Sequence, residues 1–434
     1  MKFYNRAKEL KNLQDIEQLS QISSKMSIIV GRRRIGKTKL IREAYKDSIY
    51  FFVSKKDESL LCEEFITILQ NSLDIKILGE FKKFSTLFEY IMQLAQNRAF
   101  TLIIDEFQEF LSINNTIYSD MQNIWDSYKD STKLNLVLSG SIYSLMKKIF
   151  EDKKEPLFGR ANNKIHLKAF DINTLKEILK DHYANFTNED LLSFYTLTGG
   201  VAKYVEIFVE KGAFTLESQL NLIFDEYSLF LEEGKNLLIE EFGKEYTTYF
   251  SILSLISSSK TSRSEIESIL ERNIGGYLDR LENEYSIIKK IKPIFAKEQS
   301  RTVKYEIIDN FFSFWFRFIY KYKSAVEIEN FDFVKNIVKR DFSMYSGKFL
   351  ERYFIEKLKR ENLFSNIGTY WEKSNKNEID IVALNSETKE LALIEVKLNK
   401  KKIDLELLKH KSQNLIQDYK AYKIEYLGFS LDDM

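Results

Sequence analysis

An apolar run that leads into a glycine-containing loop constrains this chain more than any other feature. Residues 27–30 read Ser-Ile-Ile-Val, and the loop that follows fits the pattern G-x-x-x-x-G-K-T. In such a loop, between a strand and a helix, backbone N–H groups surround phosphate oxygens, the lysine reaches the β- and γ-phosphates and the threonine binds Mg²⁺. We therefore predict a site for ATP and Mg²⁺; a turn that binds no nucleotide is the alternative. The residues expected to bind nucleotide here are Gly31, Arg34, Gly36, Lys37, Thr38 and Lys39.

Length and charge place further limits on the chain. Its 434 residues exceed what one hydrophobic core usually organises, and roughly three units are expected. The net charge is +1, so any binding to nucleic acid must come from local patches. The single Cys62 and a first segment without the apolar core of a signal peptide indicate the cytoplasm. The apolar run 311–320 contains Arg317 and is about half the length that spans a bilayer, so we expect a buried helix and no membrane partner.

Strand-like segments alternate with helical stretches after the loop. They cover residues 49–54, 100–107, 135–141 and 163–170, which predicts the α/β class: a P-loop NTPase parallel sheet with helices on both faces. The segment 100–107 ends in Asp105 and Glu106. We predict that Asp105, like Thr38, belongs to the Mg²⁺ shell and that Glu106 orients and deprotonates the attacking water. Two solvated acids at a strand end are the alternative.

Three further residues are candidates for sensing or neutralising the γ-phosphate. Ser139 and Ser141 lie where the segment 135–141 ends, and either could contact the nucleotide or serve as an ordinary turn residue. Arg160 follows Phe158-Gly159 and could neutralise charge on the transferred phosphoryl group, either in its own molecule or in a neighbour.

These motifs together resemble the archaeal-type ATPase family of AAA-related and STAND-related P-loop proteins, which also occurs in bacteria. The likeness rests on Asn5-Arg6 with Glu9-Leu10, the loop 31–38, the Asp105-Glu106 strand, residues 138–141 and residues 158–160. It implies that Phe3, Asn5 and Arg6 lie near the adenine. The family's lid usually carries Gly-Gly-x-Pro, whereas this chain has Gly199-Gly200-Val201-Ala202, without the proline.

The middle of the chain is expected to contain a helical lid at 171–240 and a winged-helix domain at 241–325. Predicted helices at 246–257, 264–272 and 275–285 precede a predicted β-hairpin, which is the order of a winged helix. Its basic residues could bind DNA phosphates, but acids at 282, 284 and 298 dilute them, so packing against protein is equally open. The basic residues are Arg280, Lys289, Lys290, Lys292, Arg301 and Lys304.

Acids and a lysine near the C-terminus form a second motif. Asp380 lies in the alternating segment 377–384, and Glu395-x-Lys397 lies in the segment 391–398. Side chains two apart on a strand face the same side, so Glu395 and Lys397 converge, and a neighbouring strand can add Asp380. This is the PD-(D/E)xK nuclease pattern: the acids would bind Mg²⁺ or Mn²⁺, and Lys397 would hold the nucleophile or the scissile phosphate.

Other elements occur in the order that this nuclease core requires. Glu351, in the helical segment 347–354, matches an additional metal-binding acid, and the segment 368–371 precedes the Asp380 strand. The region resembles the DUF234-type C-terminal domain that commonly accompanies the archaeal-type ATPases. All four polar positions are present, which favours an active α/β nuclease-like domain over an inert scaffold. Residues 400–402, three lysines, could assist DNA binding or form a solvated surface.

The predicted domains are therefore an ATPase core at 1–170, the lid at 171–240, the winged helix at 241–325 and the nuclease-like domain at 326–434. Our first hypothesis is an ATPase whose nucleotide state regulates DNA binding or metal-dependent DNA cleavage. The second is a STAND-type switch that binds protein or DNA without cutting. A third is a sequence-specific DNA-binding regulator. A homo-oligomer or a protein partner is compatible with each hypothesis.

Overall fold

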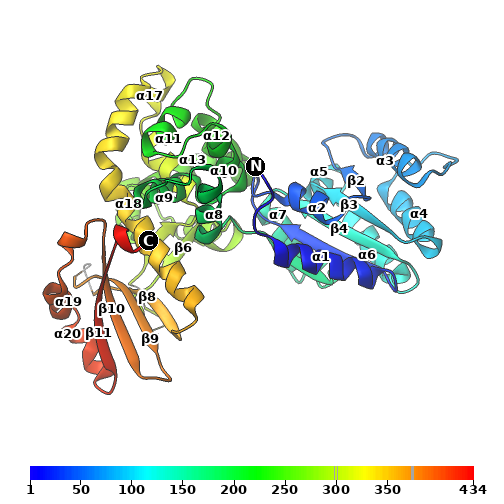
Figure 1. Ribbon diagram of the computed structural model, residues 1–434. Helices are drawn as coiled ribbons and strands as arrows, with labels where there is room; N and C mark the ends of the chain where they lie inside the picture. The colour runs from blue at the N-terminus through cyan, green and yellow to red at the C-terminus, as the bar shows by residue number, and fades with distance from the viewer. Residues whose placement is uncertain (298, 301, 373–375) are drawn as a thin grey trace. The chain divides into compact units, whose positions relative to one another are not determined.

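The computed structural model describes all residues except 298, 301 and 373–375, and the chain folds into two compact units. The first unit contains residues 2–169 and 201–203, and the second contains residues 170–200 and 204–434. Glu298 and Arg301, two residues of the predicted winged helix, lie outside the described residues. The units are described separately below (Figure 1).

The first unit is built on a parallel sheet with strand order β2-β3-β4-β1-β5. Its strands are β1 (Lys25–Val30), β2 (Ile49–Phe52), β3 (Phe100–Asp105), β4 (Leu134–Gly140) and β5 (Asn163–His166). The helices are α1 (Ala7–Ser20), α2 (Lys37–Ala44), α3 (Glu58–Leu73), α4 (Phe84–Asn97), α5 (Phe110–Ile113), α6 (Ile117–Tyr128) and α7 (Tyr143–Glu151). The predicted α/β class with a parallel sheet is confirmed.

Alternation along the strands explains why helices cover both faces of this sheet. Ile28 of β1 belongs to a core built with α3, α4 and α6, whereas its neighbour Ile29 belongs to a separate core with α1 and α2. In β3, Ile104 belongs to the first of these cores and Ile103 to the second. Successive strand residues point to opposite faces, so a strand that is apolar on both must be covered on both.

The second unit begins with helices and continues into a two-stranded antiparallel pair. Its helices before that pair are α8 (Ile172–His182), α9 (Asn188–Thr198), α10 (Ala202–Glu210, which starts in the first unit), α11 (Leu216–Ile223), α12 (Phe230–Phe242), α13 (Tyr246–Ser257), α14 (Arg263–Leu270) and α15 (Gly275–Asp279). The helix predicted at 275–285 continues beyond α15 as a π-helical turn at 280–284. The pair is β6 (Ile288–Ile291) with β7 (Lys304–Ile307).

The run 311–320, which is too short to span a bilayer, is mostly buried, as predicted. It forms α16 (Asn310–Phe314) and a π-helical turn at 315–320, with Phe314 and Phe318 fully buried. Among the residues that the structure describes, none of the helices is long and apolar enough to cross a membrane.

The C-terminal part of the second unit is a mixed sheet with strand order β11-β10-β9-β8. The strands are β8 (Asn366–Tyr370), β9 (Ile379–Asn385), β10 (Glu390–Lys397) and β11 (Lys423–Ser430). β10 pairs antiparallel with β9 and parallel with β11. The helices are α17 (Lys323–Glu327), the long α18 (Phe331–Glu361), α19 (Leu405–Lys411) and α20 (Gln413–Ile416). The predicted strands at 377–384 and 391–398 correspond to β9 and β10.

Candidate functional site

The predicted phosphate-binding loop lies between β1 and α2. Gly36 has a φ of 98°, a backbone conformation that glycine adopts without strain, and helix α2 begins at the next residue. Lys37 is buried, and its Nζ donates to the carbonyl oxygens of Gly31 at 2.6 Å and of Arg32 at 3.1 Å. The ammonium therefore lies within the loop. Arg34, with a φ of 69°, is half-buried on this loop, and Lys39 is exposed on the first turn of α2.

The predicted magnesium residues lie side by side at the end of β3. Thr38 Oγ1 donates to Asp105 Oδ2 at 3.3 Å, and the hydroxyl of Tyr50 donates to the same oxygen. Asp105 is buried. Burial, together with the hydrogen bond to Asp105, raises the pKa of the Tyr50 hydroxyl, which therefore stays a donor. Tyr50 is absent from the motif because it lies on β2, the strand beside β3.

Glu106 is oriented by two residues that the motif does not contain. Its Oε2 accepts hydrogen bonds from Gln108 Nε2 at 2.6 Å and from Ser141 Oγ at 2.6 Å. Its backbone has a φ of 54°, in the left-handed region, directly after β3 ends. Ser139 is fully buried, and no described residue bonds its Oγ. Of the two predicted sensor serines, Ser141 is therefore the one that contacts the predicted catalytic glutamate.

Arg160 and the N-terminal Asn-Arg element both have partners within the first unit. Arg160 pairs with Asp126 of α6 at 3.1 Å, so its predicted role at a nucleotide requires this partly exposed ion pair to open. Arg6 is buried and donates to the carbonyl oxygen of Lys168 at 2.6 Å. Asn5 Oδ1 accepts from the backbone N–H of Arg6. Their predicted roles stay predictions.

The segment that follows the paired glycines returns to the phosphate-binding loop. The backbone N–H of Lys203 donates to the carbonyl oxygen of Arg34 at 3.1 Å. Gly200 has a φ of 73°, and a Cβ there would lie 2.1 Å from the carbonyl oxygen of Phe170. Position 200 therefore has no room for a side chain, although the family's proline is absent here.

The C-terminal motif residues come together as the strand spacing predicts. Lys397 Nζ lies 2.6 Å from Glu395 Oε1 and 3.2 Å from Asp380 Oδ2, and the backbone N–H of Val396 donates to Asp380 Oδ2 at 2.7 Å. Burial alone would lower the pKa of Lys397, but the hydrogen bond to Glu395 and the charge of Asp380 outweigh it, so the pKa is raised. The ammonium thus stays charged between the carboxylates.

Glu351 of α18 completes the set of predicted acids. Burial, and then the negative charges of Asp380 and Glu378, raise its pKa well above the usual range, so it carries a proton near neutral pH. Within the described residues, no group of three or more His, Cys, Asp or Glu side chains is arranged to hold a metal ion. Lys397 lies between Asp380 and Glu395, which explains why these acids do not converge on one point. Metal binding by Glu351, Asp380 and Glu395 stays a prediction.

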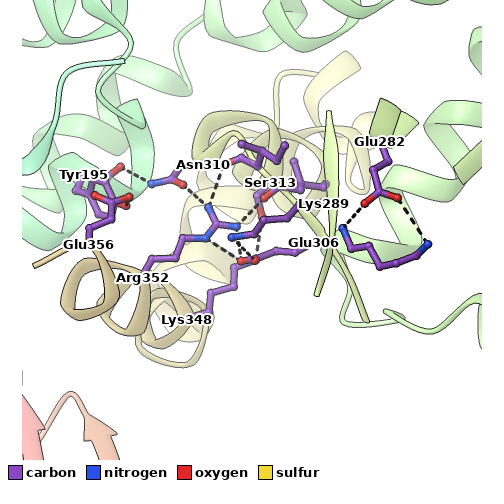
Figure 2. Close-up of polar contacts among 12 residues, drawn as sticks. Tyr195, Glu282, Lys289, Glu306, Asn310, Ser313, Lys348, Arg352 and Glu356 are labelled. Carbon is purple, nitrogen blue, oxygen red and sulfur yellow. Dashed lines mark hydrogen bonds and ion pairs between the residues drawn. The ribbon is translucent and has the colours of Figure 1, made fainter. Parts of the chain in front are cut away.

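A polar cluster around Arg352 connects α18 to neighbouring elements of the second unit (Figure 2). Arg352 donates to Glu306 of β7, through Nε at 2.8 Å, and to Asn310 Oδ1 at 2.6 Å. Asn310 Nδ2 in turn donates to the carbonyl oxygen of Tyr195 on α9 at 3.1 Å. The cluster therefore joins α9, α16, β7 and α18. Because Glu351 directly precedes Arg352 on α18, the cluster also fixes the backbone that carries Glu351.

Lys348 lies one turn before Arg352 on α18. Its pKa is lowered to about 7, mainly by burial and then by the positive charge of Arg352. Glu306, Arg317 and Glu351 also lie near its ammonium group. Its Nζ donates to Ser313 Oγ at 2.8 Å. Because the folded state releases this proton at lower pH than the unfolded chain, the group adds stability as pH rises from about 7 to the unfolded value. We expect the free energy of unfolding of the wild type, relative to Lys348→Met, to rise by roughly 1–3 kcal/mol over that range.

Urea titrations at pH 6 and pH 10 measure this difference. Lys359→Met removes an exposed lysine of the same helix and should show no such change between the two pH values. A difference between wild type and Lys348→Met that is the same at both pH values would contradict the expected role of Lys348.

Acids pair with the basic residues of the β6–β7 region. Lys289 Nζ lies 3.0 Å from Glu306, and Lys304 Nζ lies 2.8 Å from Glu378 and faces the ring of Trp371. Arg280 pairs with Glu245 at 3.3 Å. These pairs partly neutralise the predicted basic surface and link β7 to the C-terminal sheet.

Comparison with known proteins adds the following. Residues 3–208 match the model of an ATPase domain found predominantly in Archaea, and residues 315–414 match DUF234, described as archaeal and bacterial proteins of unknown function. An uncharacterized protein of Methanocaldococcus jannaschii is 28% identical, over 97% of this chain and 94% of that protein.

Two solved structures share the fold. The Walker-type ATPase of Pyrococcus abyssi has 17% identity and a TM-score of 0.53, covering 72% of this chain and 96% of that one. The ORC2 protein of Aeropyrum pernix has 15% identity and a TM-score of 0.50, covering 76% and 95%. Identities this low report on the fold alone. Taken with the geometry above, the family matches establish that residues 3–208 are an ATPase domain of the predominantly archaeal family and that residues 315–414 belong to DUF234.

Proposed function

We propose that this protein is an ATPase whose nucleotide state regulates metal-dependent cleavage of DNA at its C-terminal site. The observation that carries the proposal is the placement of Lys397 between the carboxylates of Asp380 and Glu395, at 3.2 Å and 2.6 Å. A lysine held charged beside two acids is suited to a phosphodiester and a nucleophilic water. The same chain has a separate ATPase domain, which could supply the regulation.

At the ATPase site, the residues of the first unit have separate roles. Lys37 donates hydrogen bonds to two carbonyl oxygens of the loop. With nucleotide bound, it would donate to the β- and γ-phosphates instead. The adjacent hydroxyl of Thr38 and carboxylate of Asp105 are oxygen ligands of the kind that Mg²⁺ prefers, and bound Mg²⁺ neutralises charge on the phosphates. Glu106, oriented by Ser141 and Gln108, would align the attacking water.

At the C-terminal site, the described residues include no group of three or more acids arranged to hold a metal ion, but the two carboxylates of Asp380 and Glu395 suit a divalent cation whose other ligands are water and substrate. Glu395 is buried, and no described residue donates to its Oε2, so this oxygen is an open acceptor. Mg²⁺ is commonly held by one or two carboxylates, with water and substrate phosphate as its other ligands. Asp380 and Glu395 would hold the cation, which activates water when bound. Lys397 would then be released from the acids to hold the scissile phosphate.

The long helix α18 offers a physical route for regulation. It carries Glu351 toward the C-terminal site and Arg352 into the buried cluster that contacts α9. The chain leaves α9 at Thr198 and, after two glycines, reaches Lys203, which bonds the phosphate-binding loop. A nucleotide-dependent change at Lys203 would reach α9 along the chain itself, and the cluster that contacts α9 also holds α18.

A nucleotide-dependent switch that does not cut DNA is the second candidate. The observations that favour it are the acids paired with the basic residues of the β6–β7 region and the lack, among described residues, of a ready group of three metal-binding acids. In this function the helices α13–α15 with β6–β7, which we interpret as a winged helix, and the DUF234 region would bind protein or DNA.

The experiment that separates these functions is a cleavage assay on supercoiled, linear and single-stranded DNA, in Mg²⁺ or Mn²⁺, with and without ATP. We expect Asp380→Ala and Lys397→Ala to abolish cleavage and leave ATP hydrolysis unchanged, because both residues lie at the C-terminal site. Cleavage unchanged in both variants would exclude that site from the reaction. ATP-dependent oligomerisation without cleavage of any substrate would support the switch.

A further inference from the structure

A second lysine reaches the predicted nuclease site from an element outside the sequence motif. Lys411 is the last residue of α19, and its Nζ lies 3.6 Å from Glu395 Oε1. Lys397 Nζ lies 2.6 Å from that same oxygen. The side chain of Glu395 is only 6% exposed, whereas that of Lys411 is 24% exposed. The Lys411 ammonium therefore lies between a buried acid and the solvent from which a substrate arrives.

The end of α19 is fixed by its surroundings. Leu408 is fully buried in the core of the C-terminal sheet. Ser412 is also fully buried and caps the C-terminal end of the helix. Its backbone N–H donates to the carbonyl oxygen of Leu408, and its Oγ lies 3.3 Å from the hydroxyl of Tyr426 on β11. Asp404 caps the start of the helix by accepting from the N–H of Leu407. The backbone that carries Lys411 is thus held at both ends.

Lys409, on the same helix, shows what an ordinary surface lysine looks like here. Its side chain is 49% exposed and pairs with Glu406, three residues earlier, at 2.7 Å. Such a local pair on a helix surface contributes little to stability. Lys411 instead approaches an acid 16 positions away in the sequence that lies on β10. The two lysines therefore provide a matched comparison on one helix.

The charges at the site leave a role open for Lys411. Glu395 Oε1 faces the ammonium groups of both Lys397 and Lys411, while no described residue donates to Glu395 Oε2. A single carboxylate needs only one of these cations as its partner, and the 3.6 Å contact is longer than a hydrogen bond. An ammonium group on a flexible stem is a common binder of phosphate. Once Glu395 engages a cation, both ammonium groups would face an anionic substrate.

We propose that Lys411 is a second phosphate-binding residue of the C-terminal site, contacting the DNA backbone beside the phosphate that Lys397 holds. This inference rests on the proposed function and adds a residue that the Glu395-x-Lys397 motif does not contain. It assigns α19 to the DNA-binding surface.

Binding of a fluorescein-labelled DNA duplex, measured by anisotropy in Ca²⁺ to limit cleavage and at several NaCl concentrations, tests the proposal. Lys411→Met should weaken binding several-fold and reduce the slope of log K against log[NaCl] by about 0.9, the value for one phosphate contact. Lys411→Arg should retain most of the affinity. Lys409→Met, the matched control, should bind like the wild type. In Mg²⁺, Lys411→Met should also lower kcat/KM for cleavage about tenfold or more, with ATP hydrolysis unchanged.

The outcomes distinguish this proposal from the proposed function. Cleavage by the wild type, with Lys411→Met indistinguishable from Lys409→Met in both binding and cleavage, would overturn the role of Lys411 alone. Binding that depends on Lys411 in a protein that never cleaves would support Lys411 as a phosphate ligand and overturn the nuclease function. Absence of both DNA binding and cleavage in the wild type would overturn both.

Discussion

Lys37→Ala is expected to abolish ATP hydrolysis, with a loss of at least about 100-fold in kcat. The Lys37 ammonium is buried within the phosphate-binding loop, where its present acceptors are the carbonyl oxygens of Gly31 and Arg32. Alanine removes the positive charge that would stabilise the β- and γ-phosphates as negative charge redistributes in the transition state. Phosphate release at saturating ATP measures the loss.

Lys46→Ala provides the control for Lys37→Ala. Lys46 is exposed just beyond the C-terminal end of α2, so removing its charge tests whether any lysine near this helix matters. We expect it to hydrolyse ATP like the wild type. A Lys37→Ala variant that retains more than a tenth of wild-type activity would contradict the assignment of the phosphate-binding loop.

The second large effect is expected on stability, from Arg352→Met. Arg352 donates to Glu306, to Asn310 and to the carbonyl oxygens of Ile307 and Ile308. Burial alone would raise the pKa of Glu306, but the charges of Arg352 and Lys289 hold it below its usual range. Methionine leaves Glu306 with one cation fewer in a mostly buried position, and breaking a buried pair in this way costs about 3–5 kcal/mol.

The midpoint of urea unfolding, followed by tryptophan fluorescence, measures this effect. Arg360→Met is the matched control, because Arg360 lies on the same helix in a more exposed pair with Asp171, and its removal should cost less than about 1 kcal/mol. The double variant Glu306→Gln with Arg352→Met should recover part of the loss, since no buried carboxylate is left without its partner. Equal losses for Arg352→Met and Arg360→Met would show that the cluster does not anchor α18.

Lys37 and Arg352 belong to different units, which the chain itself joins between Gly200 and Val201. Lys37 belongs to the loop that Lys203 contacts through Arg34, and Arg352 holds α18 next to the residue that approaches the C-terminal site. The Arg352→Met variant can be assayed without urea, at a temperature where it stays folded. If it then hydrolyses ATP but its cleavage of DNA no longer responds to ATP, the cluster contributes to regulation as well as to stability. This outcome would favour the first proposed function over a nuclease whose activity does not depend on ATP.

The parts of the site that the sequence predicts are those in which neighbouring residues act together. The strand, loop and helix from Ser27 to Ala44 are contiguous, so their apolar pattern and glycines predict both the fold and the ligand. Glu395 and Lys397 lie two apart on one strand, and this spacing alone requires that they face the same side. Local chemistry of this kind can be read without knowing which strands are neighbours.

Other contacts are decided only by the tertiary structure. Tyr50 reaches Asp105, Ser141 reaches Glu106, and Lys411 reaches Glu395, and in each case the partners come from different elements. Sheet order β2-β3-β4 and the docking of α19 bring them together, and no spacing rule connects such positions. The sequence by itself thus determined the ATPase domain, the paired acids and the lysine motif. Packing determined which side chains orient them, because that orientation depends on neighbours in space that are distant along the chain.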